Sequence, residues 1–268
     1  MRPKENRFID AARLSITAGI VVALGGCAGP APESSPVGPS GPPRVQAEVV
    51  ARHAHQFNED DPERRAGSQG EQIAAAYLVA HLQTAGYSTF LDAVPVSDLV
   101  RSTNVVTTPP SGRRPLVAVT VPYDTPAPSA AIPEAAEGEG AEELGLFLEL
   151  ARALALARPE HRVSFVALGA ETAEVAGGRL GSRRLVIYQR ERTLDPLMVV
   201  LEDIQVGAGP VRATGDEASQ VEAGAAPGRA AGRVAEVFEA AGLEVMTVSG
   251  GAQEAGDALL EYLIARTR

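Results

Sequence analysis

The residue of this sequence that is best placed to do chemistry is Glu171. It follows a short and nearly continuous apolar run, residues 162–168, which suits a strand buried on both faces of a parallel sheet. Gly169 and Ala170 end that run. Ligands of open α/β sheets lie at the carboxyl ends of the strands, so a carboxylate at this point is a candidate general base. The alternative is that Glu171 simply begins a solvated loop.

The four histidines are the other side chains that could bind a metal. His53 and His55 have the H-x-H spacing that places both imidazoles on one face of a strand. Their neighbours have the apolar spacing of a helix, however, and residues i and i+2 of a helix point apart. We expect neither to be a ligand, and we expect His81, which lies inside a predicted helix, to be structural. His161 precedes the strand that leads to Glu171.

Helices and strands alternate along the part of the chain that must position these residues. Ser68 and Glu71 have the spacing of a capping box, which predicts a helix from there to about Thr84. Further helices are predicted at residues 44–57, 141–157, 182–190, 228–241 and 252–266, and strands at 88–94, 103–107, 115–121, 162–168, 197–202 and 243–248. The helix that leads directly into strand 162–168 is typical of a βαβ crossover. The predicted fold is a three-layer α/β sandwich with a mostly parallel central sheet flanked by helices.

Composition excludes some classes of partner. The 268 residues suffice for one sizeable domain and a leader, and 45% of them are hydrophobic. The net charge is −10 and the basic residues are scattered, so we expect no nucleic-acid partner. Tryptophan is absent and aromatic residues make up only 4%, which argues against a platform on which bases or sugars stack.

Residues 1–26 read as a signal peptide of the lipoprotein type. A basic start precedes an apolar run that is short for a membrane span, and the run ends in Leu24-Gly25-Gly26-Cys27, which resembles the bacterial lipobox. Cys27 is the only cysteine of the chain, so we expect it to be the lipidated first residue of the mature protein rather than a chance cysteine. Because Ala28 follows it, and not Asp, the outer membrane is favoured over the inner one.

Residues 27–43 are predicted to be a tether between the lipid and the domain. This stretch is rich in proline, glycine and serine, a composition that favours extended polyproline geometry and cannot form a core. The remaining residues, 44–268, form the predicted α/β domain.

The order of several motifs resembles that of the di-zinc exopeptidases, a family that includes bacterial aminopeptidases and glutaminyl cyclases. The similarity runs from about residue 60 to about residue 207. Its motifs are Arg65-Ala-Gly-Ser-Gln-Gly-Glu71, Gly86-Tyr87, Asn104-Val105-Val106, Leu148-Glu-Leu-Ala-Arg152, Val163-Ser-Phe-Val-Ala-Leu-Gly-Ala-Glu171 and Gly181-Ser182. In that family two metal ions activate a bridging water and a glutamate takes its proton, a role that the resemblance gives to Glu171.

The resemblance also implies that most metal ligands are missing. The family's His-x-Asp is here Pro122-Tyr123-Asp124, which removes one histidine ligand and keeps the aspartate that would orient it. The bridging aspartate corresponds to Glu139, and the second of the paired glutamates corresponds to Thr172.

Two further ligand positions of the family must be compared with the later part of this chain. The later aspartate corresponds to Asp203, with Glu202 as the rival because one residue of register reverses which side chain points inward. The last histidine has no counterpart. Of five metal ligands, only Glu139 and Asp203 are left as residual candidates, so we expect no bound cofactor, although zinc is the metal of the family.

Three hypotheses for function follow. The first is a membrane-anchored lipoprotein whose exopeptidase-like domain has an eroded metal site and binds a peptide or an envelope protein. The second is an active metal-dependent aminopeptidase that uses Glu171 as its base, with a reduced metal site or with histidines brought from elsewhere. The third is a purely structural envelope lipoprotein. A histidine within ligand reach of Glu171 would favour the second hypothesis.

Overall fold

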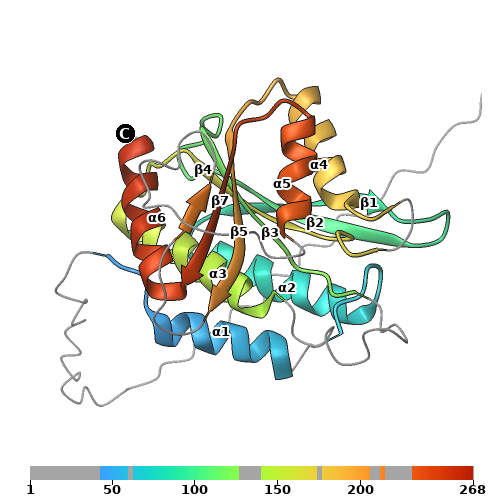
Figure 1. Cartoon of the computed structure of the whole chain (residues 1–268), viewed down its shortest axis with the longest axis horizontal. Helices are drawn as coiled ribbons and strands as arrows, with labels where there is room; N and C mark the ends of the chain where they lie inside the picture. Colours follow the sequence, from blue (N-terminus) through green and yellow to red (C-terminus); the bar gives the residue numbers. More distant parts are fainter. Residues whose placement is uncertain are drawn as a thin grey trace, which may run out of the picture. The chain divides into compact units, whose positions relative to one another are not determined.

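The computed structural model describes residues 43–59, 63–126, 140–173, 177–205, 212–214 and 231–267 (Figure 1). The predicted signal peptide (residues 1–26), Cys27, nearly all of the predicted tether and Glu139 lie outside these residues. The helices of the described part are α1 (Ala47–Glu59), α2 (Gln69–Thr84), α3 (Ala141–Ala157), α4 (Leu180–Glu191), α5 (Ala231–Ala240) and α6 (Ala252–Arg266). None of these helices is long and apolar enough to span a membrane.

The described strands form one sheet of seven strands in the order β1-β2-β4-β3-β5-β7-β6. They are β1 (Ser88–Pro95), β2 (Arg101–Thr108), β3 (Val117–Pro122), β4 (Val163–Leu168), β5 (Leu197–Gln205), β6 (Arg212–Thr214) and β7 (Val245–Gly251). The four central strands, β4, β3, β5 and β7, are parallel. The outer strands β1, β2 and β6 pair antiparallel. The carboxyl ends of the central strands therefore share one edge of the sheet.

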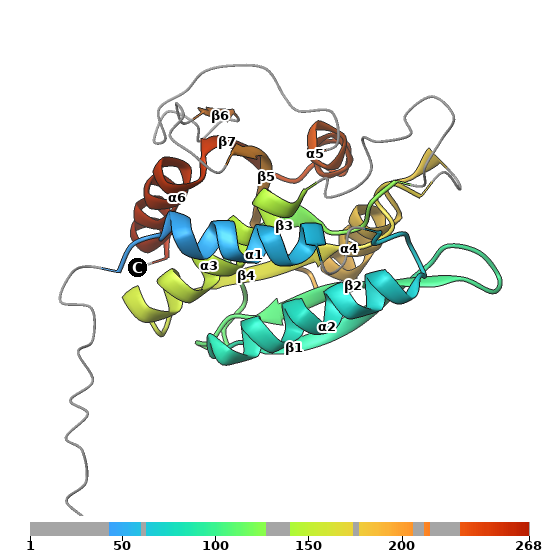
Figure 2. The ribbon, with the colours of Figure 1, turned by 90° about the horizontal axis from the view of Figure 1, so that it is seen from below.

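Helices cover both faces of the sheet, so the predicted three-layer α/β sandwich is confirmed. On one face α1, α2, α3 and α6 enclose the larger apolar core, and on the other α4 and α5 enclose a smaller one (Figure 2). Strand β3 shows how the sequence produces these layers. Val117, Val119 and Val121 belong to the larger core and Ala118 to the smaller one, because successive side chains of a strand point to opposite faces.

Strand β4, which leads to Glu171, is buried along its whole length, as predicted. Phe165 is completely buried in the larger core, where its ring meets the rings of Tyr87 and Phe147 edge to face. Each pair of ring centroids is 5.3 Å apart. Such packing fixes the position of the strand from which the candidate site begins.

The structure differs from the predicted elements mainly on the side of the sheet formed by β5, β7 and β6. Strand β5 continues to Gln205 through an irregularity between Leu201 and Ile204, three residues beyond its predicted end. Strand β6, residues 212–214, was not predicted, because three residues are too few to show an alternating pattern. The predicted bounds of helices 141–157 and 252–266 are confirmed to the residue.

The beginning of α1 is fixed by two carboxylates from distant parts of the chain. The backbone N–H of Val45 donates to Asp257 Oδ1 of α6 at 2.9 Å, and that of Gln46 donates to Glu149 Oε1 of α3 at 3.0 Å. Glu149 is completely buried and forms two 2.6 Å bonds with the guanidinium of Arg152. These bonds satisfy amides that a helix start otherwise leaves free.

Candidate functional site

Glu171 follows the carboxyl end of β4, where the sequence predicts it. Gly169 and Ala170 form the turn after the strand, and Ala170 has a left-handed φ of 57°. The Glu171 carboxylate accepts hydrogen bonds from the backbone N–H and the hydroxyl of Ser182, the latter at 3.1 Å. Since Ser182 lies in the first turn of α4, Glu171 satisfies a free amide at the start of that helix.

The charge state of Glu171 depends on burial more than on this contact. The pKa of Glu171 is raised to about 8, mainly by burial and then by the negative charge of Asp124, while the hydrogen bonds from Ser182 and the charge of Arg179 oppose the shift. Arg179 is itself paired with Glu236 of α5 at 3.0 Å. Near neutral pH the side chain therefore carries a proton in a large fraction of molecules.

Asp124 has both of its oxygens occupied by the Glu171–Thr172 segment. Oδ1 accepts from the N–H of Glu171 at 2.9 Å, and Oδ2 accepts from the N–H of Thr172 at 2.9 Å and from its hydroxyl at 2.6 Å. The side chain is only 4% exposed, and burial raises its pKa. Asp124 thus ties the end of β3 to the turn after β4 and has no imidazole to orient.

The two residues before Asp124 are held by strand pairing and by hydrogen bonds, and the second of them, Tyr123, is part of the protein interior. Pro122 is the last residue of β3, paired with Leu168 of β4. Tyr123 is completely buried and donates its hydroxyl hydrogen to the carbonyl of Thr103 at 2.8 Å. The Tyr123 carbonyl accepts from Nε of Arg64 at 2.8 Å. At the position that the resemblance gives to the first histidine ligand, the chain thus has a partly exposed proline of the sheet, whose side chain carries no metal donor.

Glu71 is a third carboxylate at this edge of the sheet and, like Asp124, it is buried. One of the two hydrogen bonds of the predicted capping box is formed, since the N–H of Glu71 donates to Ser68 Oγ at 3.0 Å. The Glu71 carboxylate does not bond the Ser68 amide. It accepts from the N–H of Gly67 at 2.5 Å and from the hydroxyl of Ser102. Burial raises the pKa of Glu71 to about 7, and the charge of Asp124 contributes to that shift.

Two glycines allow these groups to approach one another. A Cβ at Gly169 would lie 2.7 Å from Glu71 Oε1, and one at Gly181 would lie 2.9 Å from Glu171 Oε1. Buried Asn104 joins the two glycines, accepting from the N–H of Gly169 at 3.1 Å and donating to the carbonyl of Gly181 at 2.9 Å. The Asn-Val-Val and Gly-Ser motifs of the resemblance thus have a structural role in this chain.

Asp203 lies in a different group of carboxylates. It is exposed, with a left-handed φ of 46°, whereas Glu202 is 4% exposed. Of the two rivals, Glu202 is therefore the buried one. The charge of Asp203 acts on Glu202 and on Glu143, whose carboxylate accepts from the N–H of Ile204 at 3.1 Å. The charges that act on Glu171 are those of Asp124 and Arg179.

The histidines make contacts other than with Glu171. His53 Nδ1 lies 2.7 Å from the hydroxyl of Tyr77, and its ring packs on that of His81. His55 is exposed beside Glu59. His161 is completely buried, with Nε2 2.8 Å from the hydroxyl of Tyr87 and Nδ1 accepting from the N–H of Val163.

The donor set does not fit the zinc ions that the resemblance implies. Within the described ranges, no group of three or more His, Cys, Asp or Glu side chains is placed to hold a metal. The oxygens of Asp124 and Glu171 are already hydrogen-bonded, and Thr172 supplies a hydroxyl that donates to Asp124. Zinc sites need several nitrogen or carboxylate donors aimed at one point.

Sequence reasoning missed Glu71 and Arg64 as parts of this region. The capping-box spacing identified Glu71 but predicted only a local contact. Arg64 is completely buried, and its guanidinium donates to the carbonyls of Tyr123 and Phe57, the latter at 2.9 Å. A fully buried arginine is rare, so its role depends on tertiary contacts that no local pattern reveals.

Solved structures confirm the fold. A Zn-dependent exopeptidase from Parabacteroides distasonis matches with a TM-score of 0.65 and 11% identity, over 83% of this chain and 99% of its own. A leucine aminopeptidase precursor from Bacteroides thetaiotaomicron gives 0.64 and 14%, over 83% and 98%. Glutaminyl cyclase from Fimbriiglobus ruber gives 0.62 and 14%, over 82% and 95%.

In sequence, no protein-family model and no curated protein matches the chain. The chain therefore has the fold shared by Zn-dependent exopeptidases and glutaminyl cyclases, and its chemistry must be argued from its own residues.

Proposed function

We propose that this chain is a lipid-anchored envelope protein whose exopeptidase-fold domain does not hydrolyse peptides and acts by binding. The observation that carries the proposal is the bonding of Asp124. Its two oxygens accept three hydrogen bonds from Glu171 and Thr172, so the group that would orient a metal-binding histidine instead closes the turn after β4.

The condition of Glu171 supports the same conclusion. A general base must be within hydrogen-bond reach of the proton that it takes, with a free oxygen directed to it. Both oxygens of Glu171 accept from Ser182. The side chain is therefore better suited to hold α4 in place than to activate water.

The membrane anchor rests on the sequence around Cys27. The lipobox-like Leu24-Gly25-Gly26-Cys27 and the absence of any other cysteine favour lipidation at this position, and Ala28 favours the outer membrane. Several acyl chains on one residue give stable anchoring, which a single chain does not. The partner that the domain would bind is a peptide or an envelope protein.

Metal content tests the non-catalytic proposal. We expect the full-length chain, purified in detergent and dialysed against buffer that contains zinc and then against metal-free buffer, to retain far less than one zinc per chain. We also expect no aminopeptidase or glutaminyl cyclase turnover above that of a Glu171→Gln variant. Elemental analysis and the two assays measure these quantities, and manganese in place of zinc repeats the test.

A result of about two zinc ions per chain would overturn the proposal. So would turnover that Glu171→Gln abolishes. Either outcome would mean that residues outside the described ranges, such as Glu139, complete a metal site.

A further inference from the structure

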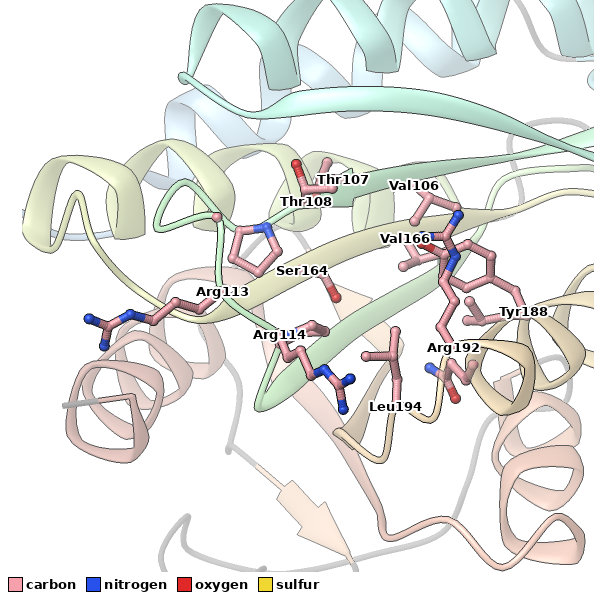
Figure 3. Close-up of a pocket in the computed structure, with 15 residues that line it drawn as sticks. Val106, Thr107, Thr108, Arg113, Arg114, Ser164, Val166, Tyr188, Arg192 and Leu194 are labelled. Carbon is pink, nitrogen blue, oxygen red and sulfur yellow. The ribbon is translucent and has the colours of Figure 1, made fainter.

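A cavity of about 380 Å³ lies at the other end of the sheet from Asp124 and Glu171. It is bounded by the carboxyl end of β2, the segment before β3, the amino end of β4 and the last turns of α4 (Figure 3). Cavities of about 300–1,000 Å³ are typical of small-molecule sites. The position is separate from the edge of the sheet where the exopeptidase resemblance places its chemistry.

The walls of this cavity are largely apolar. Val106 of β2, Val166 of β4, Leu185 of α4 and Leu194 line it, together with Pro109 and Pro115. In Figure 3 the guanidinium of Arg192 lies beside Val106, Val166 and Tyr188. Its centre is 4.6 Å from the centroid of the Tyr188 ring, so the aromatic face helps to hold the cation in the cavity.

Charge distinguishes the cavity from the rest of the chain. Arg113, Arg114 and Arg192 line it, and the described lining residues include no carboxylate, although the whole chain has a net charge of −10. One guanidinium nitrogen of Arg114 is 3.4 Å from the carbonyl of Thr193, which holds that side chain near the cavity. A surface of this kind attracts an anion.

The partial negative charge at the carboxyl end of α4 only weakly disfavours an anion in the cavity. The carboxyl end of a helix carries a partial negative charge, of about half an elementary charge. Here the carbonyl of Gln189 accepts from the N–H of Leu194 at 2.9 Å and from that of Arg192 at 3.2 Å, so it is already satisfied. The full charges of the arginines therefore dominate the field in the cavity.

Gln189 gives the cavity a second polar requirement. The residue is 3% exposed and lines the cavity, and its side-chain nitrogen donates to the sulfur of Met198 at 3.2 Å. Its side-chain oxygen is buried and has no hydrogen-bond partner among the described residues. Buried amide oxygens are nearly always bonded, so this one is suited to accept from an N–H group of a ligand.

We propose that this cavity binds the carboxyl-terminal end of a peptide, or an equally small N-acylated amino acid, with an apolar side chain. The carboxylate would pair with Arg114 and Arg192, the amide N–H would donate to Gln189 Oε1, and the side chain would lie against Val106 and Val166. Because the cavity shares no residue with the Asp124–Glu171 region, this inference holds whether or not the chain hydrolyses peptides.

Binding of N-acetyl-L-leucine to the full-length chain tests the inference. We expect saturable binding with a dissociation constant of about 1 mM at low salt, which weakens as salt screens the arginines. N-acetyl-L-leucinamide, which lacks the carboxylate, and 4-methylpentanoate, which lacks the N–H, should each bind about tenfold more weakly. Isothermal calorimetry measures the affinities, and N-acetyl-L-alanyl-L-leucine distinguishes a peptide end from a single amino acid.

Two variants locate the site. The double variant Arg114→Gln/Arg192→Gln should lose at least about tenfold in affinity. The control Arg101→Gln removes one positive charge at the other end of β2 and should keep the affinity, whereas Arg192→Gln alone, which removes the same charge inside the cavity, should weaken it. Gln189→Met puts an apolar side chain of similar length beside Met198, so it should keep the fold and abolish the preference for N-acetyl-L-leucine over 4-methylpentanoate. Circular dichroism verifies folding of each variant.

Three outcomes would overturn the inference. They are no saturable binding of N-acetyl-L-leucine to the wild-type chain, unchanged affinity in the double arginine variant, and tighter binding of inorganic phosphate than of N-acetyl-L-leucine. If Gln189→Met leaves the ligand preference unchanged, the assignment of the N–H group is wrong.

Discussion

Burial is the largest cause of the raised pKa of the carboxylates of Glu71, Asp124 and Glu171, which lie at one edge of the sheet. Like charges at close range add to the shift, because the charge of Asp124 raises the pKa of both glutamates. Proton binding to these carboxylates therefore stabilises the folded state as the pH falls. The sign of this effect can be measured as the change in the free energy of unfolding with pH.

The first prediction concerns Glu71, whose pKa is about 7 in the folded chain and 4.5 when unperturbed. Between these values the folded state binds more protons than the unfolded one, so this group's contribution to stability is fully present below about pH 4.5 and is lost as the pH rises towards 7. Glu71→Gln cannot titrate. Its free energy of unfolding, relative to wild type, should rise by up to about 3 kcal/mol over that interval.

Urea unfolding at several pH values measures the difference. The difference between the two proteins is the quantity to follow, since half-buried His53 and completely buried His161, with pKa values lowered to about 4, titrate in the opposite sense in both. Glu254→Gln, on the exposed face of α6, is the matched control and should show no such trend. A flat difference for Glu71→Gln would mean that Glu71 is ionised and solvated.

The second prediction concerns Asp124. Asp124→Asn replaces one acceptor oxygen by an NH₂ group, while all the groups that face it from Glu171 and Thr172 are donors. At least one buried donor loses its partner, so we expect a loss of about 1–3 kcal/mol in the free energy of unfolding at neutral pH. Exposed Asp98→Asn should change it by less than about 0.5 kcal/mol.

Among the elements, β4 and α4 hold the candidate site together. Strand β4 delivers Glu171, and the first turn of α4 receives it through Ser182. The close approach of Gly169 and Gly181 requires that neither residue has a side chain. The position of this edge of the sheet thus depends on the packing of β4 against the helices of the larger core.

Phe165→Ala tests that dependence. The ring is completely buried between Tyr87 and Phe147, so its removal leaves a cavity in the larger core. We expect a cost of about 3–5 kcal/mol in chemical denaturation. Leu91→Ala on β1, where the side chain is 57% exposed, is the control and should cost far less. Equal effects of the two substitutions would contradict the central position of β4.

At the scale of the whole molecule, anchoring by Cys27 is the prediction to test. Metabolic labelling with a radioactive fatty acid should label the wild-type chain and leave Cys27→Ser unlabelled, because the chain has no other cysteine. Membrane fractionation should show the same difference. Equal labelling of the two proteins would exclude lipidation at this residue.

The fold was predictable from sequence because its elements carry strong local patterns. Residues 163–168 are apolar except for Ser164, and residues 141–157 and 252–266 are long enough, and have apolar residues spaced closely enough, to form amphipathic helices, so each element follows from its own residues. The three-residue β6 and the extension of β5 past its irregularity depend on pairing with β7, which no local pattern shows.

The candidate site was predictable only in part. The sequence placed Glu171 at the end of a strand, and the structure does so too. It could not show that Glu71 accepts from Ser102, because those residues lie 31 positions apart and meet only in the folded chain. Nor could it decide between Glu202 and Asp203, since an irregular strand breaks the alternation on which such a choice depends.

The hydrogen-bonded start of α1 has a mechanical consequence if the chain is anchored through Cys27, as proposed. A pull on that end reaches residue 45 first, where the completely buried Val45 packs over Gly256 and its amide is bonded to Asp257 of α6. The next amide along the chain is bonded to Glu149 of α3. The load is thus divided between two helices of the larger core at its point of entry, while the sheet edge that holds Glu171 and the cavity beside Arg192 both lie beyond the loaded segment.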